Sequence, residues 1–348
     1  MSGGGIEKAL GGQNEEEWRE QRKTLQEPLK LHPLSSKEPH RSRMLEMREK
    51  CKGRDQEVGN ILSSTFKYND QLKLVMCEVP KVASTTWQIL LLRLGGFKGN
   101  ITKDLRKRWD YAKIPNKQFI QLKSQTEALA RMATYTTFFL TRHPFERLVS
   151  AYFDKFSGRS TYEYYKKNVG RAIARAQAKA HLYGLHDSIF HDDLLEKEDF
   201  KKLDSKEKSE VIQYIHIMKT GEISFPQFVK YLIGYKKNNN VEKMDNHWLP
   251  QMQICRPCAF SYSYIIRFDN LTNESNKLLD YIQTQTTTET LPKGPRITFP
   301  GNNRPFVKHE ETEKMLKQIS DEDVEILREI YADDFSVLNH DPHLYRGH

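Results

Sequence analysis

Two short segments carry the residue types that bind anions. The first, residues 80–86, reads P-K-V-A-S-T-T and places one cation and three hydroxyl groups within seven residues. The second, residues 142–150, reads R-H-P-F-E-R-L-V-S. A lysine supplies a compact positive charge, and an arginine grips a phosphate through two parallel hydrogen bonds. Both segments therefore predict contacts to phosphate or sulfate.

Each segment lies where a predicted strand gives way to a predicted helix. The apolar run 73–79 predicts a buried strand, and 85–94 predicts a helix that ends at Gly95-Gly96. Residues 135–141 predict a second strand, and Pro144 fits the first turn of the next helix. A helix N-terminus offers unpaired N–H groups and the positive end of a dipole to an anion. Two alternatives remain open. The residues before the helix at 85–94 could form an ordinary Ser/Thr cap, and Arg142 could pair with an acidic neighbour on the surface.

The rest of the chain alternates strands and helices in the manner of an α/β fold. The helix after Pro144 has an apolar stripe of helical period, made of Phe145, Leu148, Val149, Tyr152, Phe153 and Phe156. A third strand is predicted at 262–268, followed by a helix at 270–281. Further helices are predicted at 162–183, from Ser224, and after Ser320, where Asp323 takes the capping-box position. This order predicts a central, mostly parallel sheet flanked by helices.

The composition bounds the class of protein and its partners. The 348 residues carry a net charge of +9, which favours anionic partners. Residues 1–45 are polar and predict a stem or disordered arm, and 46–348 predict the folded domain. We see no secretory signal and no apolar run of about 20 residues, so we expect a membrane anchor to be absent from this sequence. A nucleotide kinase-like or nucleic-acid-binding protein is an alternative that the missing G-x-x-x-x-G-K-[ST] loop disfavours.

Four cysteines and three glycosylation sequons bear on the compartment. Cys51, Cys77 and the C-x-x-C pair Cys255 and Cys258 are compatible with two disulfides or with four reduced thiols. A zinc site would need a second C-x-x-C pair. The sequons begin at Asn100, Asn270 and Asn273 and modestly favour an oxidising lumen.

Taken together, the ordered motifs resemble the Golgi carbohydrate sulfotransferases, including the chondroitin, dermatan and N-acetylgalactosamine 4-O-sulfotransferases. Residues 80–87 resemble that family's 5′-phosphosulfate loop, and 142–156 resemble its 3′-phosphate motif. The block H-W-L-P-Q at 247–251, the C-x-x-C that follows it, 264–271, 297–300 and 330–338 also fit in order. The resemblance covers roughly residues 51–342 and implies a P-loop-like three-layer fold that binds 3′-phosphoadenylyl sulfate (PAPS).

The sequence departs from the family pattern at three positions. The family usually has cysteine where Ser84 stands, asparagine where Thr86 stands and an acidic residue where His143 stands. The two hydroxyl residues keep hydrogen-bonding ability, whereas His143 changes the local charge. The departures motivate a second hypothesis, an inactive glycan-binding or PAPS-binding protein of the same fold.

The resemblance and the residue chemistry together give a set of candidate site residues. The predicted PAPS contacts are Pro80, Lys81, Val82, Ala83, Ser84, Thr85, Thr86, Arg142, His143, Pro144, Phe145, Glu146, Arg147, Leu148, Val149 and Ser150. Lys81 is also a predicted catalytic residue because its charge can stabilise the leaving oxygen. His247 is the leading candidate for the general base, ahead of Glu78, His143 and His186. A basic cleft for the sugar chain is expected from Arg106, Lys107, Arg108, Arg171, Arg175 and Lys179.

The predicted reaction is sulfuryl transfer from PAPS to a sugar hydroxyl without a metal. The leading acceptor is the 4-position of N-acetylgalactosamine in chondroitin, with dermatan, terminal N-acetylgalactosamine or glucuronic acid as alternatives. The expected partner is a glycosaminoglycan or other glycan, not nucleic acid. The resemblance implies a glycoprotein on the lumenal side of the Golgi apparatus, held by a single-pass membrane anchor that this sequence does not show. The oligomeric state is left open.

Overall fold

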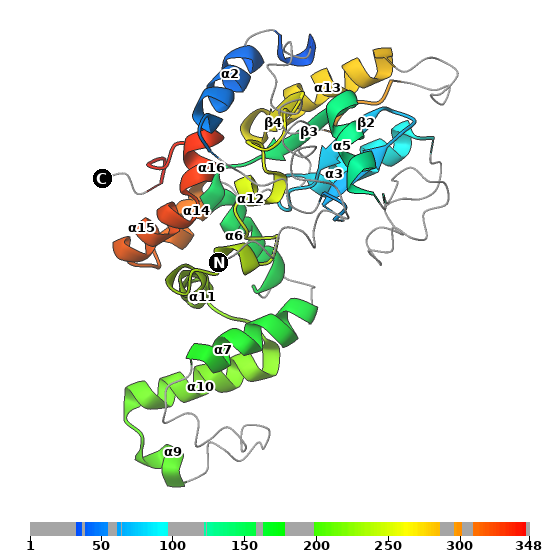
Figure 1. The fold of residues 1–348 in the computed structure, drawn as a ribbon. Helices are drawn as coiled ribbons and strands as arrows, with labels where there is room; N and C mark the ends of the chain where they lie inside the picture. Colours follow the sequence, from blue (N-terminus) through cyan, green and yellow to red (C-terminus); the bar gives the residue numbers. More distant parts are fainter. Residues whose placement is uncertain are drawn as a thin grey trace, which may run out of the picture. The chain divides into compact units, whose positions relative to one another are not determined.

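A computed structural model describes residues 33–36, 39–54, 61–63, 65–96, 122, 124–157, 163–177, 198–285, 296–300 and 309–345 (Figure 1). They fall into two units. The first takes its residues from Met1–Pro144, Leu249–Pro305 and Ala332–Asp341. The second takes its residues from Phe145–Trp248, Phe306–Tyr331 and Pro342–His348.

The first unit is built on a four-stranded sheet in the order β1-β2-β3-β4. The strands are β1 (Phe66–Asn69), β2 (Leu74–Cys77), β3 (Thr136–Thr141) and β4 (Tyr264–Arg267). β2, β3 and β4 run parallel, with Met76 opposite Phe138 and Phe139 opposite Ile265. β2 is buried along its whole length, as expected for a strand covered on both faces. The three predicted strands are therefore confirmed, while the antiparallel edge strand β1 was not predicted.

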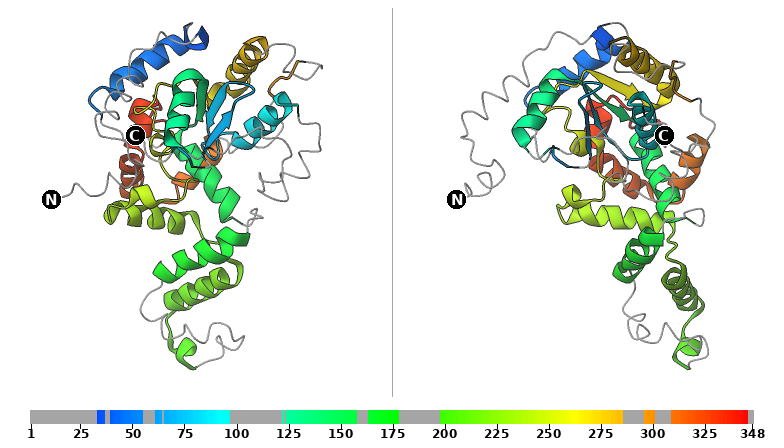
Figure 2. Two further views of the ribbon diagram at one scale, coloured as in Figure 1. Left: turned by 45° about the vertical axis from the view of Figure 1, so that its right-hand side comes forward. Right: turned by 90° about the vertical axis from the view of Figure 1, so that its right-hand side faces the viewer.

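Helices of the first unit flank this sheet (Figures 1 and 2). They are η1 (Pro33–Ser35), α2 (His40–Cys51), α3 (Ser84–Leu94), α5 (Gln125–Thr134), α12 (Gln251–Cys255), η7 (Phe268–Asn270), α13 (Leu271–Gln285) and α16 (Ala332–Val337). The predicted α/β class, with a mostly parallel sheet between helices, is confirmed. The expected boundary between residues 45 and 46 falls inside α2, which begins at His40.

α2 is fixed to the sheet unit by a buried ion pair. Arg43 donates to both carboxylate oxygens of Glu274, each at 3.0 Å, and to the carbonyl of Ile265 at 3.2 Å. The Glu274 side chain is fully buried and also accepts from the backbone N–H of Arg267 at 2.8 Å. A buried charge is tolerated when it is paired and hydrogen-bonded in this way.

Two disulfides cross-link distant parts of the first unit. Cys51 at the end of α2 pairs with Cys258, and Cys77 at the end of β2 pairs with Cys255 at the end of α12. The sequence separations are 207 and 178 residues, so each bridge closes a long loop of the unfolded chain. The two cysteines of the C-x-x-C segment therefore bond to separate partners rather than to each other or to a metal.

The second unit is helical. It contains α6 (Pro144–Lys155) after its first residue, η3 (Tyr165–Gly170), α7 (Arg171–Gln177), α9 (Glu198–Lys202), α10 (Ser205–Thr220), α11 (Phe225–Lys237), η6 (Val241–Lys243), α14 (His309–Leu316) and α15 (Asp321–Ile330). The predicted stripe of α6 packs inward: Tyr152 lies 5.3 Å from Phe225, and Phe156 lies 5.1 Å from Phe228, between ring centroids. Ser320 caps α15 by accepting from the Asp323 N–H at 3.1 Å, as predicted.

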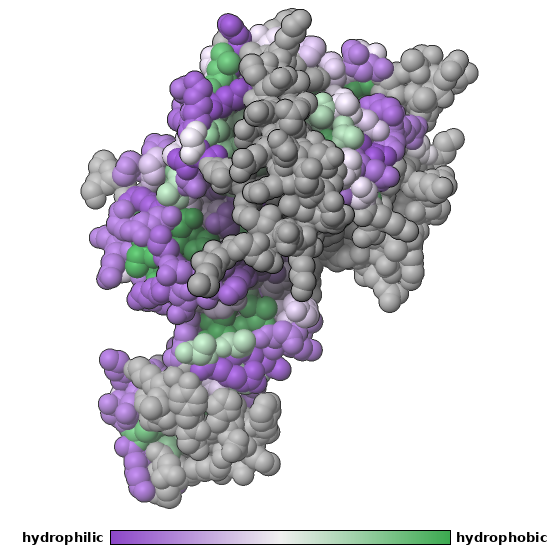
Figure 3. Space-filling model, viewed as in Figure 1, coloured by the Kyte–Doolittle hydropathy of each residue, from purple (hydrophilic) through white to green (hydrophobic). Residues whose placement is uncertain are grey.

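One face of the molecule shows mainly hydrophilic residues among those that the structure describes (Figure 3). The drawn face carries polar residues with small apolar patches between them (Figure 3). Within the described ranges, we find no helix whose length and apolar content would let it cross a membrane.

Candidate functional site

The loop between β2 and α3 has an unusual backbone. Lys81 and Ala83 have φ values of 71° and 69°, in the left-handed region that residues with a Cβ rarely adopt. Ala83 is the N-cap of α3 and makes no side-chain capping bond. Alternating right- and left-handed residues ahead of a helix turn successive backbone N–H groups toward one concavity, which is how many proteins hold phosphate. The positive φ values of Lys81 and Ala83 therefore fit the anion-binding loop that the sequence predicts at residues 80–86.

Trp87 fixes the first turn of α3 in the core. Its side chain is fully buried, and its indole N–H donates to the Ser275 hydroxyl at 3.2 Å. Its ring centroid lies 4.8 Å from that of Phe138 on β3. The Trp87 ring therefore belongs to the core, where it anchors the start of α3.

Arg142 connects the segment that follows β3 to the loop that follows β2. β2 and β3 are parallel neighbours, so the loops that follow them leave the sheet at the same edge. The Arg142 guanidinium donates to the carbonyl of Lys81 at 3.3 Å and lies 4.2 Å from the centroid of the Phe268 ring. The side chain is 1% exposed, so its charge is largely removed from water. A buried guanidinium beside an N–H-rich loop favours an anionic ligand.

A glutamine clamp fixes the backbone of Arg142. Gln251 accepts from the Arg142 N–H at 3.0 Å and donates to the Arg142 carbonyl at 2.8 Å. The buried carboxylate of Asp334 accepts from the N–H groups of Gln251 and Met252, both at 2.8 Å. Gln251 belongs to the H-W-L-P-Q block, whereas Asp334 was missed because only the fold brings it near.

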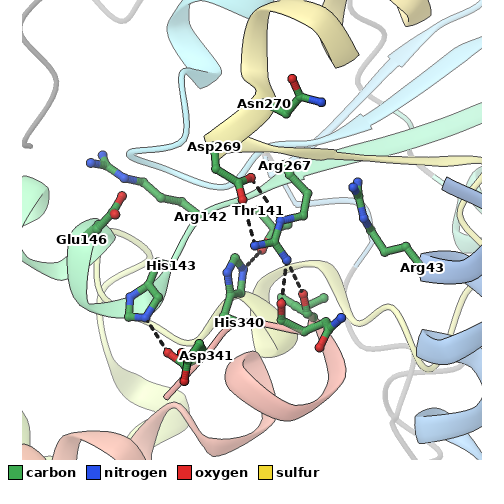
Figure 4. A network of polar contacts seen from close by, with 12 residues as sticks. Arg43, Thr141, Arg142, His143, Glu146, Arg267, Asp269, Asn270, His340 and Asp341 are labelled. Carbon is green, nitrogen blue, oxygen red and sulfur yellow. Dashed lines mark hydrogen bonds and ion pairs between the residues drawn. The ribbon is translucent and has the colours of Figure 1, made fainter. Parts of the chain in front are cut away.

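Further basic side chains gather where β3 and β4 end (Figure 4). The His143 Nε2 donates to the carbonyl of Asp341 at 2.8 Å, and His340 Nε2 lies 2.8 Å from the Thr141 hydroxyl. Arg267, the last residue of β4, forms an ion pair with Asp269 at 3.1 Å. Burial, followed by the positive charges of Arg267, His143 and Arg43, lowers the pKa of His340 well below its usual value. His340 is therefore held neutral.

In the second unit, His247 is held by a carboxylate. Its Nδ1 lies 2.7 Å from Asp245 Oδ1, which also accepts from the His247 backbone N–H at 2.9 Å. The Tyr165 hydroxyl donates to Asp245 Oδ2 at 2.9 Å and lies 3.1 Å from Nδ1 of His247. An Nδ1–H donated to a carboxylate fixes the ring orientation and leaves Nε2 as the basic nitrogen. We call Asp245, His247 and Tyr165 the histidine cluster.

The charge of Asp245 is secured by its neighbours. Burial opposes its ionisation, but hydrogen bonds from the side chain and backbone of His247, together with the Tyr165 hydroxyl, outweigh burial and lower its pKa to about 2. Asp245 is therefore ionised throughout the neutral range. Neither Asp245 nor Tyr165 was identified from the sequence, although the D-x-H spacing at 245–247 is a signal that would have found the first.

Helix α6 contributes mostly structural residues in the second unit. Arg147 is 1% exposed and donates to the carbonyl of Asn246 at 2.6 Å, which fixes the segment that carries His247. Glu146 accepts from the Tyr345 hydroxyl at 2.6 Å. The core of the second unit includes three of the predicted contacts, Phe145, Leu148 and Val149. A fourth predicted contact, Ser150, is half-buried.

Several predicted residues have other partners or lie outside the described ranges. Glu78 forms an ion pair with Lys67 at 3.2 Å, and Arg171 donates to the Lys219 carbonyl at 3.2 Å. Arg106, Lys107, Arg108, Lys179 and His186 lie outside the described residues. Over the described residues, no group of three or more His, Cys, Asp or Glu side chains is arranged to hold a metal ion.

Comparison with known proteins gives one family. The family model described as "Sulfotransferase family" matches residues 64–341. Mouse (Mus musculus) carbohydrate sulfotransferase 14 is 26% identical over 62% of this chain and 46% of its own length. Human (Homo sapiens) carbohydrate sulfotransferase 8 is 29% identical over 62% of this chain and 42% of its own length. Mouse carbohydrate sulfotransferase 11 is 26% identical over 77% of this chain and 64% of its own length. The chain thus spans about half the length of the first two relatives. No solved structure matches.

Proposed function

Since the chain belongs to the sulfotransferase family and its relatives are carbohydrate sulfotransferases, we propose that it moves a sulfuryl group from PAPS to a sugar hydroxyl. The observation that carries the proposal is the meeting of two strand-to-helix corners, where the Arg142 guanidinium reaches the Lys81 carbonyl at 3.3 Å. PAPS has a phosphosulfate at one end of its ribose and a phosphate at the other. Two adjacent anion-binding corners suit such a ligand.

The residues at these corners fit PAPS by their chemistry. The left-handed Lys81 and Ala83 present the N–H groups of residues 81–86 to the 5′-phosphosulfate. Arg142 is buried, cationic and clamped by Gln251, so it is preorganised for the 3′-phosphate. Ser150 is assigned to the same phosphate by the family resemblance.

PAPS, when bound, supplies a sulfuryl group already attached to a good leaving group, its 5′-phosphate. In the transfer, the sugar oxygen forms a bond to sulfur while the bond between sulfur and the phosphate oxygen breaks, which releases adenosine 3′,5′-bisphosphate. Lys81 and the N–H groups of the loop stabilise the charge that grows on that oxygen. The sugar hydroxyl gives up its proton in the same step.

His247 is the residue that we assign to accept this proton. Asp245 holds Nδ1 at 2.7 Å and stabilises the imidazolium once the proton has arrived at Nε2. Tyr165 fixes the carboxylate from the other side. Asp245 and Tyr165 are therefore positioning residues.

We propose the 4-position of N-acetylgalactosamine in chondroitin as the acceptor, because residues 80–83 and 142–156 most resemble the chondroitin members of the family. Dermatan and terminal sugars are the competing acceptors. The relatives carry the general name carbohydrate sulfotransferase and support only a sugar acceptor.

We further propose that the protein works on the lumenal side of the Golgi. All four cysteines are paired, which suits an oxidising compartment. Asn270 is exposed at the start of α13 and is the better placed of the two described sequons, because the Ser275 hydroxyl of the other is buried against Trp87. The Asn100 sequon lies outside the described residues.

The test is transfer of radiolabelled sulfate from PAPS to desulfated chondroitin, desulfated dermatan and glycans that end in N-acetylgalactosamine. We expect label in chondroitin, and disaccharide mapping to place it at the 4-position. Label in another glycan only would replace the acceptor and keep the activity. Tight binding of adenosine 3′,5′-bisphosphate with no label in any glycan would favour the inactive PAPS-binding protein, which the changes at Ser84, Thr86 and His143 motivate.

A further inference from the structure

A small hollow opens on helix α11 of the second unit. It measures about 260 Å³ and is lined by Tyr231, Gly234, Tyr235, Asn238 and Asn240. Four of these residues follow the helical spacing i, i+3, i+4 and i+7, so they form one face of α11 and its C-cap. The volume lies just below the range of small-molecule pockets, which begins at roughly 300 Å³. It suits a ligand group the size of one sugar ring.

The two tyrosines form a rigid wall. Their ring centroids are 5.1 Å apart with the planes at 80°, and their hydroxyls share a hydrogen bond of 2.8 Å. The Tyr231 ring also lies 6.5 Å from that of the buried Trp248. Such rings are held in place before a ligand arrives, so little side-chain entropy is lost on binding. A pyranose has an apolar C–H face that packs on an aromatic ring and hydroxyls that bond at its edge.

The asparagines place fixed amides beside these rings. Asn238 donates through Nδ2 to the Gly234 carbonyl at 2.8 Å, and Asn240 accepts through Oδ1 from Lys243 Nζ at 2.6 Å. These bonds fix the planes of both amides. Amides offer both donors and acceptors, as sugar hydroxyls do. The residues that line the hollow are uncharged, which fits a ring rather than a phosphate.

Gly234 leaves the hollow open. A Cβ built on Gly234 would meet no atom within 4 Å, so a larger side chain would enter free space. Glycine inside a helix costs roughly 1 kcal/mol relative to alanine. The helix therefore gives up stability at a position where steric crowding does not require glycine.

The surroundings of the hollow point to an anionic sugar chain close to the histidine cluster. Lys237 and Lys236, which also pairs with Glu329 at 3.4 Å, occupy the last turn of α11, and Lys243 follows Glu242 on η6. Trp248 links the two places, since its ring centroid lies 6.5 Å from that of Tyr231 and 6.4 Å from that of His247. A sugar in the hollow would thus lie one side chain away from the proposed base.

We propose that the hollow formed by Tyr231, Gly234, Tyr235, Asn238 and Asn240 is a subsite for one pyranose unit of an anionic glycan acceptor. The inference rests on the proposed function, because a glycan acceptor supplies the occupant. It assigns acceptor binding to a part of the second unit that the family motifs do not include.

The test fills the hollow without cutting into the core. Gly234→Ala and Gly234→Leu add side chains of increasing size at a helical position with open space, so both variants should fold, and melting temperatures check this. Ser209→Leu, at an exposed position of α10, is the matched control. Binding of an unsulfated chondroitin hexasaccharide to the full chain is measured by calorimetry. We expect Gly234→Leu to weaken it about tenfold, Gly234→Ala to weaken it less, and Ser209→Leu to leave it unchanged.

A second pair of variants tests the wall. Tyr235→Ala should weaken binding of the hexasaccharide more than Tyr235→Phe, because the phenylalanine keeps the ring. Saturation-transfer NMR on the wild-type chain should show the strongest signals from the protons on one face of a single sugar residue.

The outcomes separate the subsite from the proposed activity. Glycan binding that Gly234→Leu weakens, without sulfate transfer, would keep the subsite and remove the activity. Sulfate transfer with equal affinities for wild type and Gly234→Leu would remove the subsite and keep the activity. Weaker binding of adenosine 3′,5′-bisphosphate to Gly234→Leu would assign the hollow to the nucleotide and overturn the proposal, and so would a wild-type chain that binds no glycan.

Discussion

The two units hold their histidines in opposite ways. In the first unit, His340 is buried beside Thr141, and the positive charges of Arg267, His143 and Arg43 add to burial in keeping it neutral. In the second unit, His247 is half-buried and faces the carboxylate of Asp245 at 2.7 Å. An imidazole ring thus has positively charged neighbours in the first unit and a carboxylate neighbour in the second.

The difference matches the separate roles that we propose for the two groups of residues. A neighbourhood of cations stabilises a bound anion and opposes protonation of a histidine. A carboxylate at Nδ1 does the reverse, since it favours the imidazolium and so prepares the ring to take a proton. In the function that we propose, the cation-rich neighbourhood belongs to the residues assigned to the sulfate donor, and the carboxylate-held histidine is the residue assigned to the acceptor hydroxyl.

The strongest test of this division removes the base. His247→Gln should lower kcat by roughly 10²- to 10⁴-fold, the usual contribution of a general base. The dissociation constant of adenosine 3′,5′-bisphosphate should stay the same because that ligand is assigned to the first unit. His216→Gln, at an exposed histidine of α10, is the control. A change of less than about threefold in kcat would remove His247 from the mechanism.

The complementary test removes the cation. Arg142→Ala should weaken binding of adenosine 3′,5′-bisphosphate about 100-fold, since a charge-assisted bidentate contact is lost. Arg142→Lys keeps the charge but not the fork, and we expect a loss of about tenfold. Calorimetry measures both, with the surface variant Arg296→Ala as the control. Unchanged affinity in a folded Arg142→Ala protein would contradict the assignment of the phosphate.

A subtler test removes the charge of Asp245, the residue beside the base, and keeps the shape of its side chain. Asp245→Asn should lower kcat about tenfold, because the imidazolium loses its stabilising carboxylate. The acid side of the pH–kcat profile should also move to lower pH, since the ring then binds a proton less readily. A merely structural role for Asp245 would lower kcat at every pH and leave the profile in place. Tyr165→Phe should give a smaller shift in the same direction.

The smallest expected effect concerns His340 and stability. Because its folded-state pKa lies below the usual 6.5, the unfolded chain takes up a proton that the folded protein refuses. Stability should therefore fall as the pH drops below about 6.5, by at most about 1.4 kcal/mol per pH unit from this residue. Thermal melts between about pH 7 and pH 5 should show a flatter pH dependence for His340→Gln than for the wild type. Parallel curves would mean that other groups dominate.

The local pattern of the sequence was enough to predict the elements that carry the corners. β2, β3 and β4 are runs of apolar or β-branched residues, and α6 has a clear helical stripe, so their periodicity identifies them. Lys81 and Arg142 lie close together because they follow β2 and β3, which are parallel neighbours in the sheet. β1 was missed because its four residues, F-K-Y-N, form a short edge strand, and the Asn69 side chain shapes the turn that leads to β2 by accepting from the Leu72 N–H.

Contacts between distant residues could not be predicted in the same way. Asp334 is 83 residues from Gln251, and Tyr165 is 82 residues from His247. Nothing in the local sequence of either residue signals its partner, since both contacts depend on how the helices pack. The pairing of the cysteines is similar: the count allowed two disulfides, but only the fold places Cys77 beside Cys255.

The Cys77–Cys255 bridge has a practical consequence. It ties the strand that precedes the anion-binding loop to the short helix whose first residue clamps Arg142. Protein made in a reducing host will lack this covalent link at the very place where the sulfate donor is expected to bind. Recombinant work should therefore use a secretory route or an oxidising strain, and thiol reductants should be left out of assay buffers, or an inactive preparation will be mistaken for an inactive protein.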